Sequence, residues 1–163
     1  MPDPVPSDQL TAEGKIIEAY AALLRAWPAL ANRTIIANRS PDDAISEEEM
    51  SAVVIYAEAW RFDNDEMQGQ TRHEMLLNFE CIDSSARVGV VNRSNQWTIA
   101  QVVAAMHSDR SLGGRVEDAQ ERDVAPPMDN GKSVGGASLQ VAVRFYTPRG
   151  NHFTIVGLGG ETF

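Results

Sequence analysis

Residues 136–148, GASLQVAVRFYTP, contain the clearest strand pattern in the chain. Every second residue from 139 to 145 is apolar, and the residues between them are polar or small, which is the period of a strand that buries one face. Residues 72–82, RHEMLLNFECI, alternate in a similar way over most of their length. We therefore predict two long strands at these positions, each with a buried side and a more polar side.

Two segments have the period of helices that bury one face. Between residues 16 and 27, apolar side chains recur at steps of three and four, and a proline follows directly. Ser7 or Thr11 can cap the start of this helix. Residues 97–106 repeat the helical period, whereas residues 84–94 fit neither a helix nor a strand.

Shorter patterns complete a predicted sheet. Strands are expected at residues 34–37 and 51–60, and residues 152–156 could return as a hairpin partner. Residues 115–124 are highly charged, which favours an edge strand. Hairpin-like connections dominate this order of elements, so we predict an α+β fold, a mostly antiparallel β-sheet with two principal α-helices packed against it.

The size and charge of the chain limit what it can be. Its 163 residues suit one domain, which we place at residues 11–157, between flexible tails at 1–10 and 158–163. The net charge is -9, with 14 basic and 23 acidic residues, so stable binding to DNA or RNA is disfavoured. The N-terminus lacks a signal-peptide pattern and no apolar run could cross a bilayer, so we expect folding in a cytoplasm.

Cysteine and histidine residues give no sign of a metal or redox site. Cys81 is the single cysteine and lies in an apolar run, so we expect a small buried hydrophobe. His73, His107 and His152 fall in different elements, without the spacing that metal ligands show. The sequence therefore predicts no metal site, and structural or surface roles for the histidines.

Other motifs are incomplete. Residues 131–133, Gly-Lys-Ser, imitate a phosphate-binding loop, but Pro126 stands where the motif needs glycine. The five acids among residues 42–49 lack the calcium-loop pattern, so a solvated or interface loop is favoured. We predict no catalytic residue and no cofactor. An enzyme with a scattered site, for example one built from His152, Asp123 and Ser138, has no support from spacing.

Three stretches of the sequence have a distinctive order of elements. Residues 33–60, RTIIANRSPDDAISEEEMSAVVIYAEAW, contain a short strand, a long polar loop and an apolar strand ending near an aromatic residue. Residues 97–123, WTIAQVVAAMHSDRSLGGRVEDAQERD, contain a helix, a Leu-Gly-Gly turn and a charged strand. The alternating strand at 136–148 is the third. With the opening helix, these stretches resemble the tail terminator family of long-tailed bacteriophages and the related tail-completion proteins of the head–tail junction, over roughly residues 11–148.

The resemblance implies a structural virion protein without enzymatic activity or cofactor. Such proteins have an α+β fold and form a homo-hexameric ring, which caps the growing tail tube, ends its polymerisation and provides the surface for head–tail joining. The implied partners are further copies of the chain, the tail tube protein and a head–tail connector or neck protein. Genome DNA would pass through without specific binding and no membrane is involved, so the place of action is the tail or neck of the virion after assembly in the host cytoplasm.

A cyclic ring needs two different contact faces on each subunit. The charged strand at 115–124 and the strand that starts at Arg72 are expected to supply edges for such contacts, and the acidic loop is expected to face the lumen or the tube, where it would repel DNA phosphates. The residues hypothesised to lie at subunit or tube interfaces are Arg39, Asp42, Asp43, Glu47, Glu48, Arg72, Arg115, Glu117 and Arg122.

Two alternatives remain open on the sequence. Another neck or tail-completion subunit would share a small α+β fold with a tail terminator. A small acidic cytoplasmic adaptor or binding module would instead use the acidic loops to engage a basic partner, and would be a monomer or a dimer.

Overall fold

The computed structural model describes residues 9–39, 44–63, 69–84, 88–125 and 134–163. In chain order the elements are α1 (Ala12–Ala26), η1 (Pro28–Leu30), β1 (Thr34–Ala37), η2 (Glu47–Glu49), β2 (Ala52–Asp63), β3 (Gln70–Ser84), α2 (Val88–Ser108), β4 (Asp118–Ala125) and β5 (Val134–Pro148).

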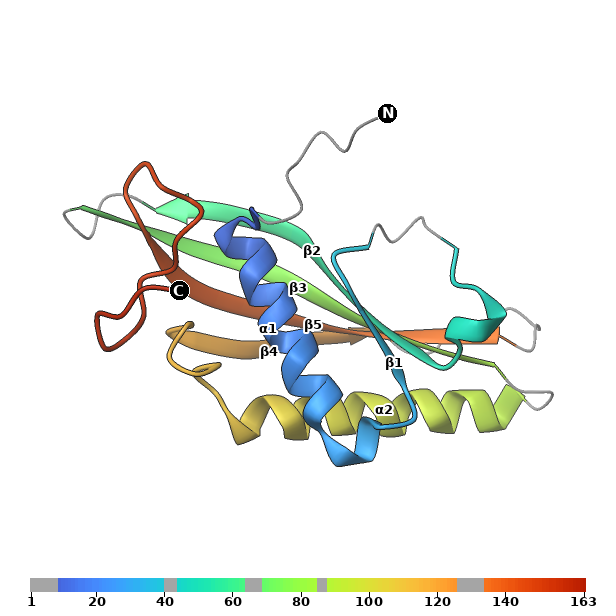
Figure 1. Ribbon diagram of the computed structural model, residues 1–163. Helices are drawn as coiled ribbons and strands as arrows, with labels where there is room; N and C mark the ends of the chain where they lie inside the picture. The colour runs from blue at the N-terminus through green and yellow to red at the C-terminus, as the bar shows by residue number, and fades with distance from the viewer. Residues whose placement is uncertain (1–8, 40–43, 64–68, 85–87, 126–133) are drawn as a thin grey trace.

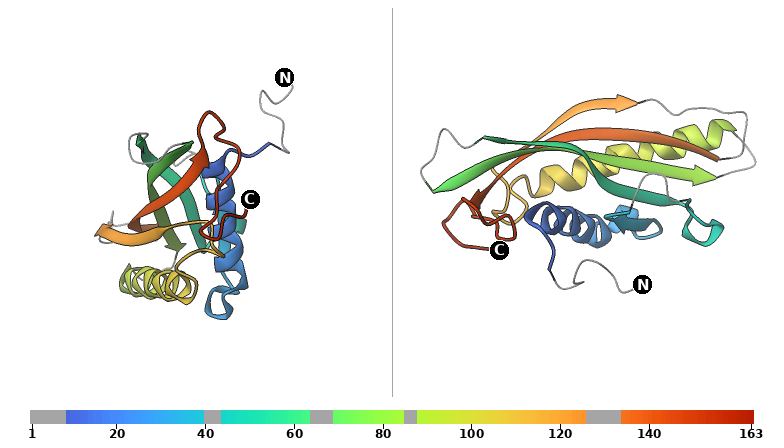
Figure 2. Two further views of the ribbon diagram at one scale, coloured as in Figure 1. Left: turned by 90° about the vertical axis from the view of Figure 1, so that its left-hand side faces the viewer. Right: turned by 90° about the horizontal axis from the view of Figure 1, so that it is seen from above.

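The five strands form one sheet in the order β1-β2-β3-β5-β4 (Figure 1). β1 and β2 are parallel, and every other pair is antiparallel. Both helices lie on the same face of the sheet, which the two views of Figure 2 show edge-on and from above. The α+β fold predicted from the sequence, with a mostly antiparallel sheet and two helices, is confirmed.

The core lies between the helices and the alternating apolar side chains of β3 and β5. Because side chains alternate across a strand, the same register that buries Phe79 beside Leu139 leaves Glu80 and Ser138 on the opposite face. Tyr20 of α1 packs edge-on against Phe79, with ring centroids 5.8 Å apart. α1 starts at the expected place, because the Thr11 hydroxyl accepts a hydrogen bond from the Gly14 N–H at 3.2 Å.

The strand that starts at Arg72 is not an edge, contrary to expectation. β3 pairs with β2 on one side and with β5 on the other along nearly its whole length, so it lies in the middle of the sheet. The charged segment forms β4, which pairs with β5 alone among the described strands, and its prediction as an edge strand is confirmed.

The C-terminal segment is held more firmly than its glycine-rich sequence indicated. Val156 makes a single antiparallel bridge to Tyr146 instead of a full hairpin strand. Beyond it, Ile155 and Phe163 exchange two backbone hydrogen bonds of 3.1 and 3.0 Å. The Lys15 ammonium also donates to the Phe163 carbonyl at 3.2 Å. Hydrogen bonds therefore connect Phe163 both to Ile155 and to Lys15 of α1.

No helix in the described ranges is both long and apolar enough to span a bilayer.

Candidate assembly surface

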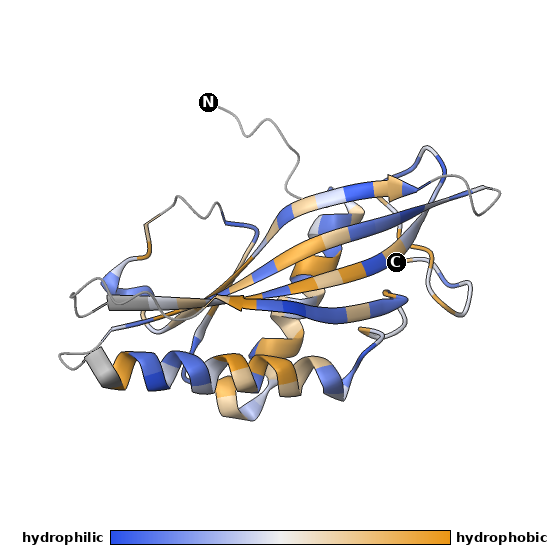
Figure 3. Ribbon diagram, turned by 180° about the vertical axis from the view of Figure 1, so that it is seen from behind, coloured by the Kyte–Doolittle hydropathy of each residue, from blue (hydrophilic) through white to orange (hydrophobic). Residues whose placement is uncertain are grey.

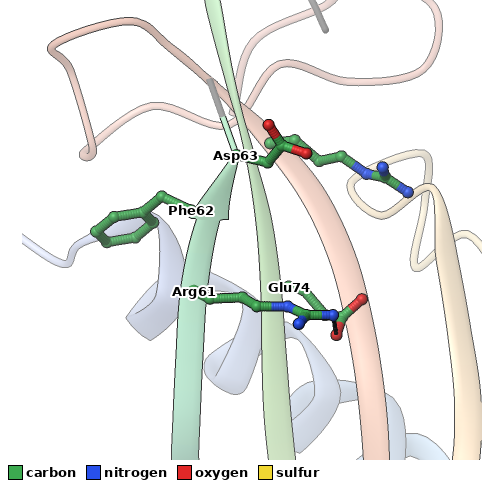
Figure 4. A pocket seen from close by; sticks show the side chains of 5 residues that line it. Arg61, Phe62, Asp63 and Glu74 are labelled. Atoms are coloured by element: carbon green, nitrogen blue, oxygen red, sulfur yellow. Dashed lines mark hydrogen bonds and ion pairs between the residues drawn. The ribbon is translucent and has the colours of Figure 1, made fainter. Parts of the chain in front are cut away.

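The sheet face without helices carries a row of alternating charges. Strand register places Arg61 of β2, Glu74 of β3, Arg144 of β5 and Asp118 of β4 side by side. Arg61 Nη2 lies 2.6 Å from Glu74 Oε1, and Arg144 Nε lies 3.1 Å from Glu74 Oε2. Figure 4 shows the Arg61 side chain reaching along the sheet to Glu74. The row therefore reads positive, negative, positive, negative from β2 to β4.

Glu74 is the centre of this charge row. Partial burial raises the pKa of its carboxyl, but the hydrogen bond from Arg144 and the attraction of Arg61 outweigh burial, so the pKa lies below its ordinary value. The hydrogen bond to Glu74 in turn raises the pKa of Arg144. The Glu74 carboxyl therefore keeps its charge to a lower pH than an ordinary glutamate does.

Two shallow hollows flank the row. One is lined by Arg61, Phe62, Asp63, Arg72 and Glu74 (Figure 4). The other lies towards β4, between Leu76 and Ala142 on the sheet floor and Arg122 at its side. Figure 3, seen from behind, shows β4 as a mainly hydrophilic strand at the border of this face. The face is thus polar and charged, with a small apolar floor.

Both borders of the sheet have open strand edges among the described residues. β1 covers β2 only as far as Ile55, so no described strand pairs with that side of β2 from residue 56 to residue 62. β4 forms the opposite border along its full length. Trp60 and Phe62 on β2 and Val124 on β4 are 55%, 48% and 48% exposed. Open edges with exposed apolar residues are surfaces that favour pairing with another strand.

The hypothesised interface residues divide between the two ends of the sheet. Arg39 binds Glu49 with both guanidinium nitrogens, at 3.0 and 2.9 Å, and this hydrogen bonding lowers the pKa of Glu49 to about 2. Glu47 and Glu48 are exposed in η2, at the end where β2 begins (Figure 1). Asp42 and Asp43 lie outside the described residues.

The other four lie on or near the strands towards the opposite end. Arg72 Nε is 3.8 Å from Glu117 Oε2, so the structure brings these two together. Arg115 instead stacks 4.3 Å over the Phe163 ring and holds the C-terminal segment. Arg122 is exposed at the irregularity of β4, between Glu121 and Asp123.

Sequence reasoning missed a buried polar cluster on the helix-covered side. His73 is fully buried, with Nε2 2.8 Å from the Thr147 hydroxyl and Nδ1 3.5 Å from a Glu13 carboxylate oxygen. Its ring stacks on Phe145 and meets His152 edge-on, at 4.6 and 4.9 Å. Burial raises the pKa of Glu13, and its interaction with His73 together with hydrogen bonds from its own backbone and from Thr11 lowers the pKa by more, so the pKa lies below its ordinary value.

The scattered site considered from the sequence is not assembled. His152 lies beside the rings of the buried cluster, next to the Phe145 end of β5. Ser138 is seven residues away from Phe145 along the same strand, or about 23 Å at the usual rise of a strand. Asp123 pairs opposite Gln140, near Ser138 and far from His152.

The remaining motifs offer no further chemistry. Cys81 is buried, as expected, and burial raises the pKa of its thiol to about 12. Within the described part of the chain, no three His, Cys, Asp or Glu side chains are grouped to hold a metal ion. Residues 126 and 131–133 lie outside that part. No protein-family model matches the chain. No curated protein matches it either.

Proposed function

We propose that this protein is a structural component of a bacteriophage tail, which assembles head-to-tail into a ring that caps the tail tube. The observation that carries the proposal is the pair of open edges, on two different strands at opposite borders of one sheet. A contact between two different patches repeats from copy to copy and closes into a ring when the rotation permits. The resemblance of the sequence to tail terminators supplies the biological setting.

The charged face supports a structural role for its side chains. Arg61, Glu74 and Arg144 are tied to one another, and Arg72 is tied to Glu117. Such pairs hold surface side chains in fixed positions, which suits repeated contacts between rigid subunits. We propose no enzymatic activity and no cofactor for this protein.

The acidic end of the sheet fits a surface that lies near DNA without binding it. Glu47 and Glu48 project from η2, and the net charge of the chain is -9. Because DNA binding depends on neutralising phosphates with Lys and Arg, such a surface repels the genome. The proposed partners are the tail tube protein and the head–tail connector or neck protein, and the proposed location is the virion tail or neck.

The first experiment is to measure the mass of the purified protein by size-exclusion chromatography with light scattering, alone and with isolated tail tubes. A six-copy ring has a mass of about 107 kDa, six times the 17.8 kDa of one chain. We expect this species, with six-fold rings in negative-stain images or at the ends of tubes. A monomer or dimer that never joins a tube would overturn the proposal and favour an acidic adaptor.

A further inference from the structure

We infer that the ring contact is an antiparallel pairing of β4 of one copy with the open edge of β2 of the next, in the register that sets Asp118 opposite Arg61. The inference rests on the proposed function, because it names the contact by which the copies join. It identifies the partner of the open edges as a second copy of this chain.

The charge row selects this partner. Within one copy the row ends in a positive residue, Arg61, at the β2 border and in a negative residue, Asp118, at the β4 border. Joining copies border to border therefore continues the alternation of this row across the junction, and the same register sets Glu58 of β2 opposite Glu121 of β4 as its one like-charge pair. Pairing β4 with itself would instead bring together two strands that each carry Asp118, Glu121 and Asp123. Like charges directly opposite on paired strands are destabilising.

Strand direction allows the same contact. From β2 through β3 and β5 to β4, each strand is antiparallel to its neighbour, so β4 runs opposite to β2. A second copy placed beside the first in the same orientation offers its β2 antiparallel to β4. The joined sheet therefore keeps one hydrogen-bonding pattern across the boundary.

The two open edges overlap over six residues. With Arg61 opposite Asp118, residues 118–123 of β4 lie along residues 61–56 of β2, and the overlap ends there because Ile55 already pairs with Ala37 of β1. With Arg61 opposite Asp118, Ala59 faces Gln120. β2 is irregular at Glu58 and β4 at Arg122, so both irregularities fall in the same part of the junction, where Glu58 lies opposite Glu121 and one position from Arg122.

The apolar side chains of the edges agree as well. Trp60 pairs with Met75 and Ala119 pairs with Val143, so both belong to the helix-covered face. In the proposed register Trp60 of one copy faces Ala119 of the next, at the border of the core. The contact would cover a tryptophan that is 55% exposed in a single copy. Large aromatic residues of this kind are frequent anchors at protein interfaces.

Charge exchange between copies tests the contact. Arg61→Asp and Asp118→Arg each set like charges together at every junction, so we expect each variant to need about tenfold more protein, or greater, for half-maximal ring formation. An equimolar mixture of the two variants should restore assembly, because alternating copies present opposite charges at both kinds of junction. The double variant, with both changes in one chain, should also assemble.

The rescue separates contact between copies from damage within one. Arg61 and Asp118 of the same copy are three strand spacings apart, roughly 14 Å, and therefore interact weakly in salt. Losing the Arg61–Glu74 pair is common to the single and the double variant, so only a new junction explains recovery. Arg93→Asp makes an equal charge change on an exposed side chain of α2 and is the control for net charge, so it should raise the concentration for half-maximal assembly by much less than Arg61→Asp does.

A cross-link fixes the register. Ala59→Cys together with Gln120→Cys should give disulfide-linked ladders up to the full ring under mild oxidation, while each single variant should not. The native Cys81 is buried and does not compete.

The outcomes distinguish the inference from the proposed function. If the native chain forms rings and the charge variants assemble as well as it does, without ladders from the cysteine pair, edge pairing is overturned and the ring stands. If the native chain forms no ring, alone or on tail tubes, the proposed function fails first.

Discussion

At the scale of single residues, the hydroxyl of Thr147 decides how His73 is held in the core. Thr147→Val keeps the shape of the side chain and removes the 2.8 Å hydrogen bond to a fully buried imidazole. A buried polar group without its partner costs roughly 1–3 kcal/mol, so we expect the free energy of unfolding to fall by about that amount in urea titrations. Thr162→Val, at an exposed position, is the control and should change stability by less than about 0.5 kcal/mol. Equal effects would show that the hydrogen bond is unimportant.

Asp83 ties together segments that are far apart in sequence. Its carboxylate accepts hydrogen bonds from the hydroxyls of Ser51 and Ser94 and pairs with Arg33 at 3.2 Å. Burial raises the pKa of Asp83. These hydrogen bonds and the Arg33 charge lower the pKa by more than burial raises it, so it lies below the ordinary value of 3.8. A lowered pKa stabilises the fold above the unfolded value, and this stability is lost as the pH falls through the folded value.

The pH dependence of stability tests this arrangement. We expect the native protein to lose stability steeply as the pH falls below about 3.8, and Asp83→Asn to show a flatter dependence in that range although it is less stable at pH 7. Asp123→Asn, on the exposed β4, should follow the native slope. Chemical unfolding at a series of pH values measures the slopes, and identical slopes for all three proteins would contradict the assignment.

The sequence could predict which positions of β3 and β5 are buried, but not what their polar members meet. The alternation that buries Phe79 and Leu139 also buries His73 and Thr147, which lie on the same face of the sheet. Their contact depends on the pairing of β3 with β5, and the contact with Glu13 depends on how α1 docks. No local pattern carries either piece of information.

At the scale of elements, the boundaries were predictable where one period dominates. β1 lies where it was expected, whereas α2 begins at Val88, nine residues before the predicted Trp97. The early part of α2 contains β-branched residues, glycine and asparagine, which are weak helix formers, so tertiary packing decides. Val91 and Asn95 are buried there, at 2% and 1% exposure.

The edges were only half predictable. The charges of β4 indicated an edge strand, because charge discourages unwanted pairing. The open edge of β2 gave no such signal, since it arises from the shortness of β1, which ends opposite Ile55. The central position of β3 likewise depends on β5 returning between β3 and β4, and this order is not encoded in any one segment.

The C-terminal segment permits a test of close packing at one glycine. A Cβ added at Gly157 would lie 2.7 Å from atoms of Glu161 and Phe163, whereas one added at Gly136 would have its nearest neighbour at 3.6 Å. We therefore expect Gly157→Ala to destabilise the protein by roughly 1–3 kcal/mol, through displacement of the hairpin that carries Phe163. Gly136→Ala is the matched control and should be close to neutral. Thermal unfolding compares the two, and a neutral Gly157→Ala would mean that residues 157–163 shift freely.

At the scale of the whole molecule, two electrostatic effects act on assembly in opposite directions. Each copy carries a net charge of -9, so copies repel one another over long distances, while the Arg61–Asp118 junction attracts at contact. The screening length falls from about 30 Å at 10 mM salt to about 8 Å at 150 mM salt, which removes repulsion between distant charges and leaves contact pairs much less affected. Screening of the net charge should therefore be the larger effect.

Ring formation is accordingly expected to strengthen between 10 and 150 mM salt, with the concentration for half-maximal assembly falling by about two- to tenfold. Glu47→Gln with Glu48→Gln removes two carboxylates far from the proposed junction and changes the net charge from -9 to -7, so it should assemble at lower concentration and depend less on salt. Light scattering across a salt series measures both proteins. Steady weakening of the native ring with added salt would mean that the junction pairs outweigh the net charge. The double charge exchange of Arg61 and Asp118 should follow the native salt dependence, because it changes neither the net charge nor the sign of attraction at the junction.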